Sequence, residues 1–577
     1  MTYGPQVPGS DAQHAVKYRG TGESFEESCN RQASGLAHGD HYKPFRDVLL
    51  NQRFLSGGRI QSSVGSFRNI TPFNCYLSGT ILDSLREGDG SIMARFDQAM
   101  GTLQMGGGIG YDFSPLRPRG SEIKKLGTTS GGPMPFMNIF DAGCKCISAA
   151  GHRRGAQMGV LRVDHPDIEE FIHAKQNTTE FTAFNLSIAV TDEFMLAVVE
   201  DKPFWLRFEG KNFREVNARD LWEMIMRSTW DWGEPGVIFI DQINDRNNLH
   251  YCETIAATNP CGEQPLPPFG ACLLGSFNLT KYLKRSISIP GSECLGEEGP
   301  LEWNFDYAQL EADIPHVVRA MDNVIDIATY PLPEQEREAK SKRRMGLGVT
   351  GVANAIERLA LPYGSPDFCI VLRSIMETIR DGCYRASVDL AKEKGAFPLF
   401  DAEEYCRSPF IKTLPLDLQE DIRKYGIRNS HLLSVAPTGT ISLCADNISS
   451  GIEPVFAYNT DRAIIGSDQV TKIHSFEDYG VRFLGHEGKI ASEVTIEEHL
   501  AVLSTAQSMV DSAVSKTCNV DGTMPWDDFK NIYMKAWRMG CKGITTYNSD
   551  GKRGSVLVDA DKKSCRIDPV TGRQECD

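Results

Sequence analysis

The sequence predicts an α/β fold, because long helical patterns alternate with short apolar runs of the length expected for buried strands. The longest helical pattern covers residues 366–394 and has a proline in its first turn. Ser365 suits the N-cap of this helix and Gly395 suits its stop, while Gly382 is expected to weaken it. A second helix is predicted over about 308–329, with its apolar residues on one face.

Two apolar runs between such helices are predicted to be buried strands. They are GVIFI at 236–240 and HLLSVA at 431–436. In α/β folds the chemistry gathers at the loops that follow the strands, so we expect the functional residues there.

Composition limits the classes of protein to which the chain can belong. With 577 residues, 41% of them hydrophobic, the chain can bury a large core, and no run of about eighteen apolar residues predicts a membrane span. The N-terminus lacks an apolar signal core, so we expect a cytoplasmic protein. The 61 basic and 76 acidic residues give a net charge of −15, which argues against broad nucleic-acid binding and favours small molecules or proteins as partners.

The 16 cysteines are expected to be mostly reduced, because no signal peptide precedes them. No CxxC pair occurs, and the lone close pair Cys144 and Cys146 lacks a second pair, so no metal site is predicted. Several cysteines are expected to be ordinary packing residues: Cys29, Cys252, Cys369, Cys383, Cys406, Cys444 and Cys518.

One cysteine stands apart, in the segment TNPCGEQPLPPFGACLLGSFNL at 258–279. The prolines of this segment exclude a helix, so it is predicted to be a loop of defined shape. Cys261 lies two positions from Asn259 on one side and from Glu263 on the other. A thiol flanked by an amide and a carboxylate on a stiff loop favours a chemical role over packing.

Another loop, APTGTIS at 436–442, carries hydroxyl residues around a glycine. Its backbone N–H groups could approach a phosphate, but an ordinary hydroxyl-rich turn fits the same residues. The glycine-rich stretches at 104–113 and 127–133 match neither GxGxxG nor the P-loop pattern, so they predict no dinucleotide fold.

Taken together and in order, these motifs closely resemble the catalytic subunit of ribonucleotide reductases over residues 45 to 555. The motifs are FNCYLSG, GGGIG, AGHRRGAQMGVLRVDHPDIEEF, NPCGEQPL, CLLGSFNL and SVAPTGTISLCADNISSGIEPVFA. The resemblance implies a ten-stranded α/β barrel, made of two antiparallel halves of five parallel strands, with residues 258–279 as a finger loop through its centre. It divides the chain into a short segment 1–45 without an ATP-cone, a body 46–555 with a specificity-loop region at about 106–171, and a flexible tail 556–577.

The resemblance also implies roles in the removal of a ribose 2′-hydroxyl. Cys261 would act as a thiyl radical on the 3′ hydrogen, Glu263 as the base for the 3′-hydroxyl, and Asn259 as a substrate ligand. Cys75 and Cys272 would supply a proton and two electrons and end as a disulfide. A catalytically dead homologue would be expected to have lost part of this set, and a simple thiol–disulfide oxidoreductase would present CxxC.

Binding residues follow from the same resemblance. The substrate would contact Asn74, Pro437, Thr438, Gly439, Thr440, Ile441 and Ser442. An allosteric deoxynucleotide or ATP would involve Asp141, Arg153, Arg154 and Gln157. In the family that effector site lies at a dimer interface, which implies a homodimer.

The class of reductase depends on the segment GCKGITTYNSDGKRG at 540–554. Two-subunit enzymes carry a tyrosine pair here, whereas this chain has Thr545 and Thr546, with Tyr547 one place later. The tail KKSCRIDPVTGRQECD has no glycyl-radical motif. The chain is most similar to the adenosylcobalamin-dependent class acting on ribonucleoside diphosphates; the alternative is a large subunit that needs a metal-radical partner subunit.

The same tail carries Cys565 and Cys576, separated by ten residues. In the family a flexible cysteine pair carries electrons from thioredoxin or a glutaredoxin-like protein to the buried disulfide, and we expect these two residues to do so. The wide spacing departs from the closely spaced pairs that are common in the family.

Overall fold

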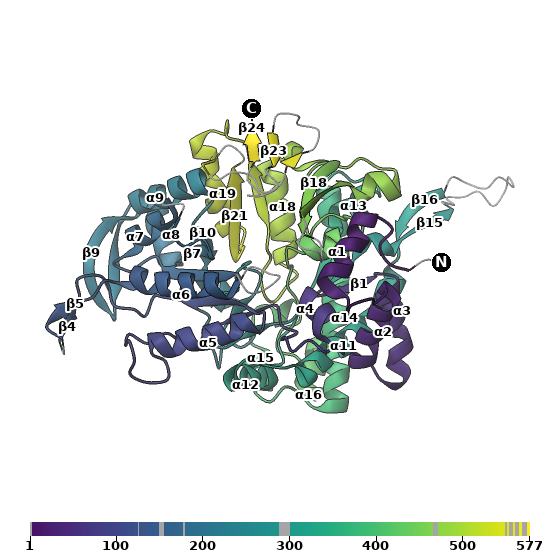
Figure 1. The fold of residues 1–577 in the computed structure, drawn as a ribbon, viewed down its shortest axis with the longest axis horizontal. Helices are drawn as coiled ribbons and strands as arrows, with labels where there is room; N and C mark the ends of the chain where they lie inside the picture. The colour runs from purple at the N-terminus through teal and green to yellow at the C-terminus, as the bar shows by residue number, and fades with distance from the viewer. Residues whose placement is uncertain are drawn as a thin grey trace.

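The computed structural model describes residues 3–124, 126–148, 155–176, 179–287, 301–465, 471–548, 551–552, 558–559, 565–567 and 574–576. Helices and strands alternate along the chain, as the sequence predicts (Figure 1).

The main sheet has eight strands, which in spatial order are β13 (Ala271–Cys272), β2 (Cys75–Leu77), β3 (Gly108–Asp112), β6 (Gln157–Arg162), β7 (Phe184–Val190), β10 (Gly236–Phe239), β21 (Gly543–Asn548) and β20 (Thr517–Val520). From β2 to β10 every neighbouring pair is parallel. At the two flanks the direction reverses, since β21 runs antiparallel to β10 and β13 runs antiparallel to β2. The strand predicted at 236–240 is confirmed as β10.

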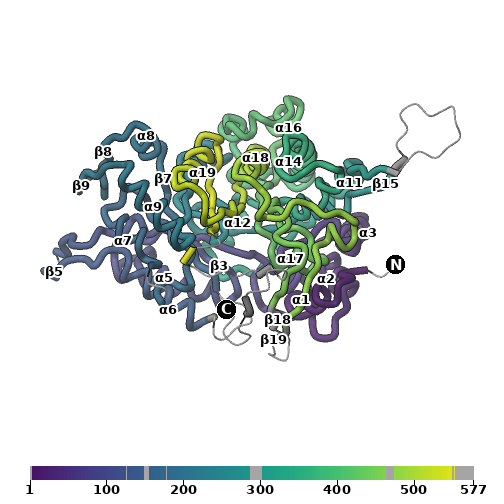
Figure 2. Tube along the Cα trace, turned by 90° about the horizontal axis from the view of Figure 1, so that it is seen from above, coloured from purple at the N-terminus to yellow at the C-terminus, as the bar shows by residue number. Residues whose placement is uncertain are grey.

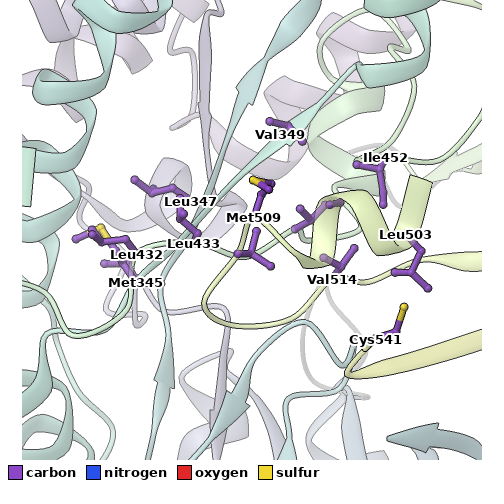
Figure 3. Packing of buried hydrophobic residues seen from close by; sticks show 14 of the residues in the cluster. Met345, Leu347, Val349, Leu432, Leu433, Ile452, Leu503, Met509, Val514 and Cys541 are labelled. Carbon is purple, nitrogen blue, oxygen red and sulfur yellow. The ribbon is translucent and has the colours of Figure 1, made fainter. Parts of the chain in front are cut away.

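A second sheet has three strands: β1 (Phe54–Ser56), β14 (Leu274–Asn278) and β17 (Gly346–Thr350). β14 and β17 are parallel. The segment predicted as a strand at 431–436 is extended but forms isolated bridges, Leu347 with Leu433 and Val435 with Val514. Figure 3 shows the apolar side chains of β17 and of this segment packed together with Met509 and Val514.

The long predicted helix is confirmed as α14 (Pro366–Lys394), with the Ser365 side chain accepting a hydrogen bond from the Phe368 N–H at its start. It packs on α11 (Tyr307–Ile327), which confirms the second prediction. Gly382 does not interrupt α14. A Cβ at this position would lie 2.9 Å from Ile314 Cδ1, so the glycine permits close contact between the two helices.

Helices cover the two sides of the molecule. In Figure 1, α5 (Ile92–Gln104), α6 (Pro133–Ser148), α7 (Ile168–His173), α8 (Asp192–Glu200) and α9 (Ala218–Trp232) lie with the eight-stranded sheet, and α1 (Pro8–Tyr18), α2 (Phe25–Leu36) and α3 (Tyr42–Leu50) lie at the opposite end with α11 and α14. α18 (Ile496–Gln507) and α19 (Trp526–Arg538) stand between them beside β21, and the view in Figure 2 shows the same arrangement. α12 (Pro333–Lys342), α13 (Val352–Glu357) and α16 (Leu416–Tyr425) complete the α11–α14 side.

Three hairpins lie at the periphery: β4–β5 (Glu122–Ile123, Thr128–Thr129), β8–β9 (Pro203–Phe208, Lys211–Asn217) and β15–β16 (Leu283–Ile287, Leu301–Phe305). No helix in the described ranges is both long and apolar enough to cross a membrane.

Between the sheets lies a separate inner cluster of buried side chains. It joins residues of the eight-stranded sheet to residues of the 258–279 loop: Cys75, Leu77, Met158, Val160, Ala189, Ile238, Ala257, Leu266, Cys272 and Leu274 are among them. The 258–279 loop is therefore part of the hydrophobic core of the protein.

Candidate functional site

The segment with Cys261 folds as a tight hairpin, which we call the finger. Its strands are β11 (Ala257–Thr258) and β12 (Pro265–Leu266), which pair antiparallel. At the turn, the Gln264 N–H donates to Asn259 Oδ1 at 3.0 Å, and the Gly262 N–H donates to the Asn259 carbonyl at 3.0 Å. Gly262 has φ 81°, a conformation that favours glycine. The predicted loop of defined shape is confirmed.

The finger is held from the eight-stranded sheet on one side. A Cβ at Gly110 on β3 would lie 2.1 Å from the Thr258 carbonyl oxygen, so only a glycine lets the finger backbone approach this strand. Farther along the sheet, the Asn185 side chain on β7 donates to the Pro260 carbonyl at 3.0 Å. This bond holds the residue next to Cys261.

The other half of the molecule holds the finger from the opposite side. A Cβ at Gly346 on β17 would lie 2.2 Å from Gln264 Nε2. The Ala513 N–H donates to the Glu263 carbonyl at 3.0 Å, and Lys542 Nζ donates to the carbonyls of the two residues before Ala513, at 2.7 and 2.8 Å. The finger thus bridges both sheets.

Cys261 is exposed at the tip of the finger, whereas its neighbours Asn259 and Glu263 are buried. It lines a cavity of about 570 Å³ that is bounded by β7, β10, β20 and β21 and by residues 447–457. A cavity of this size suits a small-molecule substrate or cofactor.

Glu263 is chemically unusual. The residue is 1% exposed, and within the described residues its Oε2 has no hydrogen-bond partner. Burial raises the pKa of Glu263 to about 7, against the smaller opposing effects of a backbone N–H and the Asn259 amide. A carboxyl that titrates near neutral pH can both accept and return a proton.

Cys75 and Cys272 lie directly opposite each other, because β2 and β13 pair in the register that joins them. Both are buried. Burial raises the pKa of the Cys272 thiol well above its usual value, and the nearby Glu263, Cys75 and Cys261 add to this effect. The Cys272 thiol therefore holds its proton, and it lies close to Glu263, Cys75 and Cys261.

Asn74 immediately precedes Cys75, and its backbone N–H donates to the Cys272 carbonyl at 3.1 Å. Its Oδ1 is buried without a partner in the part of the chain that the structure describes.

The predicted phosphate loop contains a short helix, α17 (Gly439–Leu443), which the sequence did not indicate. Thr438 has φ 52° at its N-cap, and the Thr438 hydroxyl accepts from the Gly451 N–H at 2.7 Å. Gly439 and Thr440 are exposed, a Cβ at Gly439 would meet no atom within 4 Å, and Pro437 lines the cavity. Ser442 Oγ is within hydrogen-bond distance of Ser450 Oγ and of the Thr438 and Gly439 carbonyls, and Ile441 is partly exposed.

The predicted effector residues that the structure describes lie on α6 and β6, and neither lines the cavity. Asp141 is buried on α6, where it accepts from the Ala183 N–H at 2.9 Å and pairs with Lys145 at 2.6 Å. Gln157 on β6 is also buried: its Oε1 accepts from the Tyr111 hydroxyl and its amide donates to the Phe140 carbonyl. Arg153 and Arg154 lie outside the described residues.

The residues that replace the tyrosine pair lie on β21. Thr546 is buried and its hydroxyl is 2.9 Å from that of Tyr533. Thr545 and Tyr547 line the cavity, and the Tyr547 hydroxyl has no hydrogen-bond partner within the described ranges.

In the tail, two short strands are described. β23 (Cys565–Ile567) and β24 (Gln574–Cys576) pair antiparallel, and the register places Cys565 opposite Cys576.

Some residues of the site escaped the sequence analysis. Asn185, Ala513 and Arg462 come from segments without a recognisable motif, and nothing in their local pattern marks them. Cys252, expected to pack, is exposed and was misassigned. Within the described ranges no three metal-ligating side chains cluster.

Comparisons with known proteins agree with this arrangement. The family model described as ribonucleotide reductase, barrel domain, matches residues 74–479 and 488–547. The vitamin B12-dependent ribonucleoside-diphosphate reductase of Mycobacterium tuberculosis is 34% identical over 94% of this chain and 78% of its own length. The enzyme of that name from Thermoplasma acidophilum is 31% identical over 93% and 69%. The variola virus ribonucleoside-diphosphate reductase large subunit is 25% identical over 80% and 61%. With its finger, its opposed cysteines and this match over most of its length, the chain belongs to the ribonucleotide reductase family.

Proposed function

We propose that the protein reduces ribonucleoside diphosphates to 2′-deoxyribonucleotides with adenosylcobalamin as the radical source. The observation that carries this function is the finger: it presents Cys261 to the cavity and places Glu263 and the Cys75–Cys272 pair close behind it. These are the groups that the reaction requires.

Each residue has one task. A hydrogen atom passes from the ribose 3′ carbon to the Cys261 sulfur and is returned at the end, while Glu263 accepts the 3′-hydroxyl proton. Asn259 holds the substrate through its amide nitrogen, which is buried beside the Glu263 carboxyl. The 2′-oxygen leaves as water with a proton from Cys75 or Cys272, and the two thiols become a disulfide, so two electrons reduce one ribose.

The lining of the cavity fits a large polar cofactor. Buried polar atoms that find no partner in the described residues, Thr460 Oγ1, Arg462 Nε and the Tyr547 hydroxyl, belong to residues that line it together with Cys261. Adenosylcobalamin supplies a radical by homolysis of its cobalt–carbon bond, and residues of β20, β21 and 447–457 would hold it against the finger. Thr545 and Thr546 provide no redox-active side chain for a radical from a second subunit.

The substrate phosphates would bind at the N-terminus of α17, where the first N–H groups of a helix lack helical partners. Exposed Gly439 and Thr440 leave the backbone accessible there. Asn74 would contact the ribose from the side of the Cys75–Cys272 pair.

We also propose a ten-stranded barrel as the finer architecture. The bridges Leu347–Leu433 and Val435–Val514 would extend β14 and β17 toward β20 and β21, giving a second parallel half antiparallel to β2–β10. The pairing of β13 with β2 supports closure on the other side. In this division residues 1–45 are a short leading segment, 46–555 the body and 556–577 the tail.

The proposal also covers the allosteric regulation of the enzyme and the reduction of its disulfide after turnover. A deoxynucleotide or ATP would bind near α6 and the 106–171 region at a homodimer interface, and thioredoxin or a glutaredoxin-like protein would reduce the Cys565–Cys576 hairpin. The cytoplasm provides such reductants.

The decisive experiment is an anaerobic assay of the purified chain with a ribonucleoside diphosphate, dithiothreitol and adenosylcobalamin, against a control without the cofactor. We expect deoxynucleotide only in the complete mixture, and Tyr547→Phe should retain activity. Activity that instead requires a metal-containing partner subunit, and is lost in Tyr547→Phe, would establish the two-subunit alternative.

A further inference from the structure

Arg462 has an unusual position for a charged residue. It lies on β18 (Asn459–Ile465) and lines the same cavity as Cys261. The residue is half-buried, and this burial lowers the pKa of Arg462. Within the described residues it forms no hydrogen bond or ion pair, and its Nε is buried without an acceptor.

The other charged side chains of the cavity wall already have an ion-pair or hydrogen-bond partner. Lys516 is paired with Glu453 at 2.8 Å. The remaining carboxylates of the wall each have a partner: Asp231 pairs with Lys552 at 3.0 Å, Glu234 with Lys175 at 2.9 Å, and Asp478 accepts from the Asn354 amide at 3.0 Å. Among the described wall residues that carry a positive charge, Lys516 has a counter-charge and Arg462 has none.

A neutral donor accompanies this charge. Thr460 lies two residues before Arg462 on the same strand, so the two side chains share one face. Thr460 is 3% exposed and its Oγ1 has no hydrogen-bond partner in the described part of the chain. Burying an unpaired guanidinium and an unpaired hydroxyl is costly, unless a ligand satisfies both.

We propose that Arg462 and Thr460 form a phosphate subsite in the wall of the catalytic cavity, distinct from the N-terminus of α17. One guanidinium and one hydroxyl match a phosphate group that carries a single negative charge. Adenosylcobalamin contains such a group, the phosphodiester of its nucleotide loop, so we assign the subsite to the cofactor. The assignment rests on the proposed function, because that function places the cofactor in this cavity.

The test compares two cofactor forms by equilibrium dialysis in the dark. Adenosylcobinamide lacks the nucleotide loop and its phosphodiester but keeps the cobalt and the adenosyl group. We expect Arg462→Gln to weaken adenosylcobalamin binding roughly ten- to hundredfold and to leave adenosylcobinamide binding unchanged. Arg462→Lys should recover part of the loss, because it restores the charge without the planar fork.

Two controls make the result specific. Arg207→Gln, which removes an exposed ion pair of Arg207 on β8 with Glu193, should bind both forms like the parent. Binding of the ribonucleoside diphosphate is measured in parallel; if Arg462→Gln weakens it and spares adenosylcobalamin, the subsite serves the substrate phosphates and our assignment to the cofactor falls.

Further outcomes would overturn the inference. Equal weakening of both cofactor forms would show a packing role for Arg462. The backbone of Asp559 pairs with that of Thr460. If Asp559→Asn weakens adenosylcobalamin binding as much as Arg462→Gln does, then Arg462 acts through the tail and not on the cofactor. If the parent protein and Arg462→Gln bind adenosylcobalamin equally well, the subsite is refuted and the proposed function stands. If the parent protein binds no adenosylcobalamin, both the subsite and the proposed function are refuted.

Discussion

At the residue scale, the site depends on the contrast between exposed Cys261 and its buried neighbours. Cys261→Ser should abolish deoxynucleotide formation and leave nucleotide binding nearly unchanged, because an O–H bond is too strong for the hydrogen exchange that a thiol permits. Turnover and nucleotide binding are measured on the same preparation. Cys252→Ser, which removes an exposed thiol that does not line the cavity, should remain active; detectable turnover in Cys261→Ser would refute the radical role.

Glu263 should make both stability and activity depend on pH. Its folded-state pKa of about 7 lies above the ordinary value of 4.5, so the folded protein holds a proton that the unfolded chain loses. The stability from this group is complete below about pH 4.5 and is lost as the pH rises through 7, by at most roughly 3 kcal/mol.

Glu263→Gln should therefore raise the melting temperature at pH 8 more than at pH 5, although it removes activity. In the parent, the basic form must be present for catalysis, so turnover should rise through about pH 7. Glu420→Gln, at an exposed position, serves as the control and should change neither profile. Equal shifts of the Glu263→Gln melting temperature at both pH values would contradict the raised pKa.

At the scale of elements, the close approach of β3 to the finger is the sharpest constraint. Gly110→Ala would place a methyl group 2.1 Å from the Thr258 carbonyl, and neither backbone can yield without moving the finger. We expect a loss of about 1–3 kcal/mol in unfolding free energy and a large fall in turnover. Chemical denaturation and the activity assay measure the two effects.

The matched control is Gly101→Ala on α5, where a Cβ meets no atom within 4 Å. Alanine in a helix should stabilise the protein by up to about 1 kcal/mol and spare activity. If Gly110→Ala behaves like this control, the finger is not held by the contact described above.

How far the sequence predicts an element depends on where its signals lie. α14 and β10 were predicted correctly because their caps, periodicity and apolar runs are local. The segment 431–436 was harder to predict as a strand, because the residues that it pairs with, on β17 and at Val514, are distant in sequence. Its pairing consists only of isolated bridges. The role of Gly382 is set by Ile314 on another helix, so no local pattern could distinguish a close contact from a weak point.

The same distinction applies to the site. Cys261, Glu263 and the cysteine pair were identified by a family resemblance, and the register of β2 with β13 confirms that Cys75 and Cys272 lie together. Arg462 and Asn185 became visible only through the cavity and the hydrogen bonds. In sequence, an arginine whose Nε finds no acceptor among the described residues looks like any other arginine.

At the scale of the whole molecule, we propose that the tail links the buried site to an external reductant. Cys565→Ser or Cys576→Ser should retain turnover with dithiothreitol, which reaches the buried pair directly, and lose most turnover with thioredoxin. Parallel assays with the two reductants measure this, and Cys146→Ser, an exposed cysteine on α6, is the control. Equal rates with both reductants in the tail variants would show that the hairpin carries no electrons.

The finger connects β3 and β7 on one side with β17 and the Ala513 segment on the other. A loop held in this way cannot open alone: releasing it exposes the inner cluster and separates the two sheets. The amide protons of Asn259, Gly262 and Gln264 should consequently exchange with deuterium as slowly as those of the innermost strands. The reactive thiol of Cys261 would then lie on one of the most rigid segments of the chain. A substitution that loosens the interior would therefore abolish catalysis before the protein unfolds.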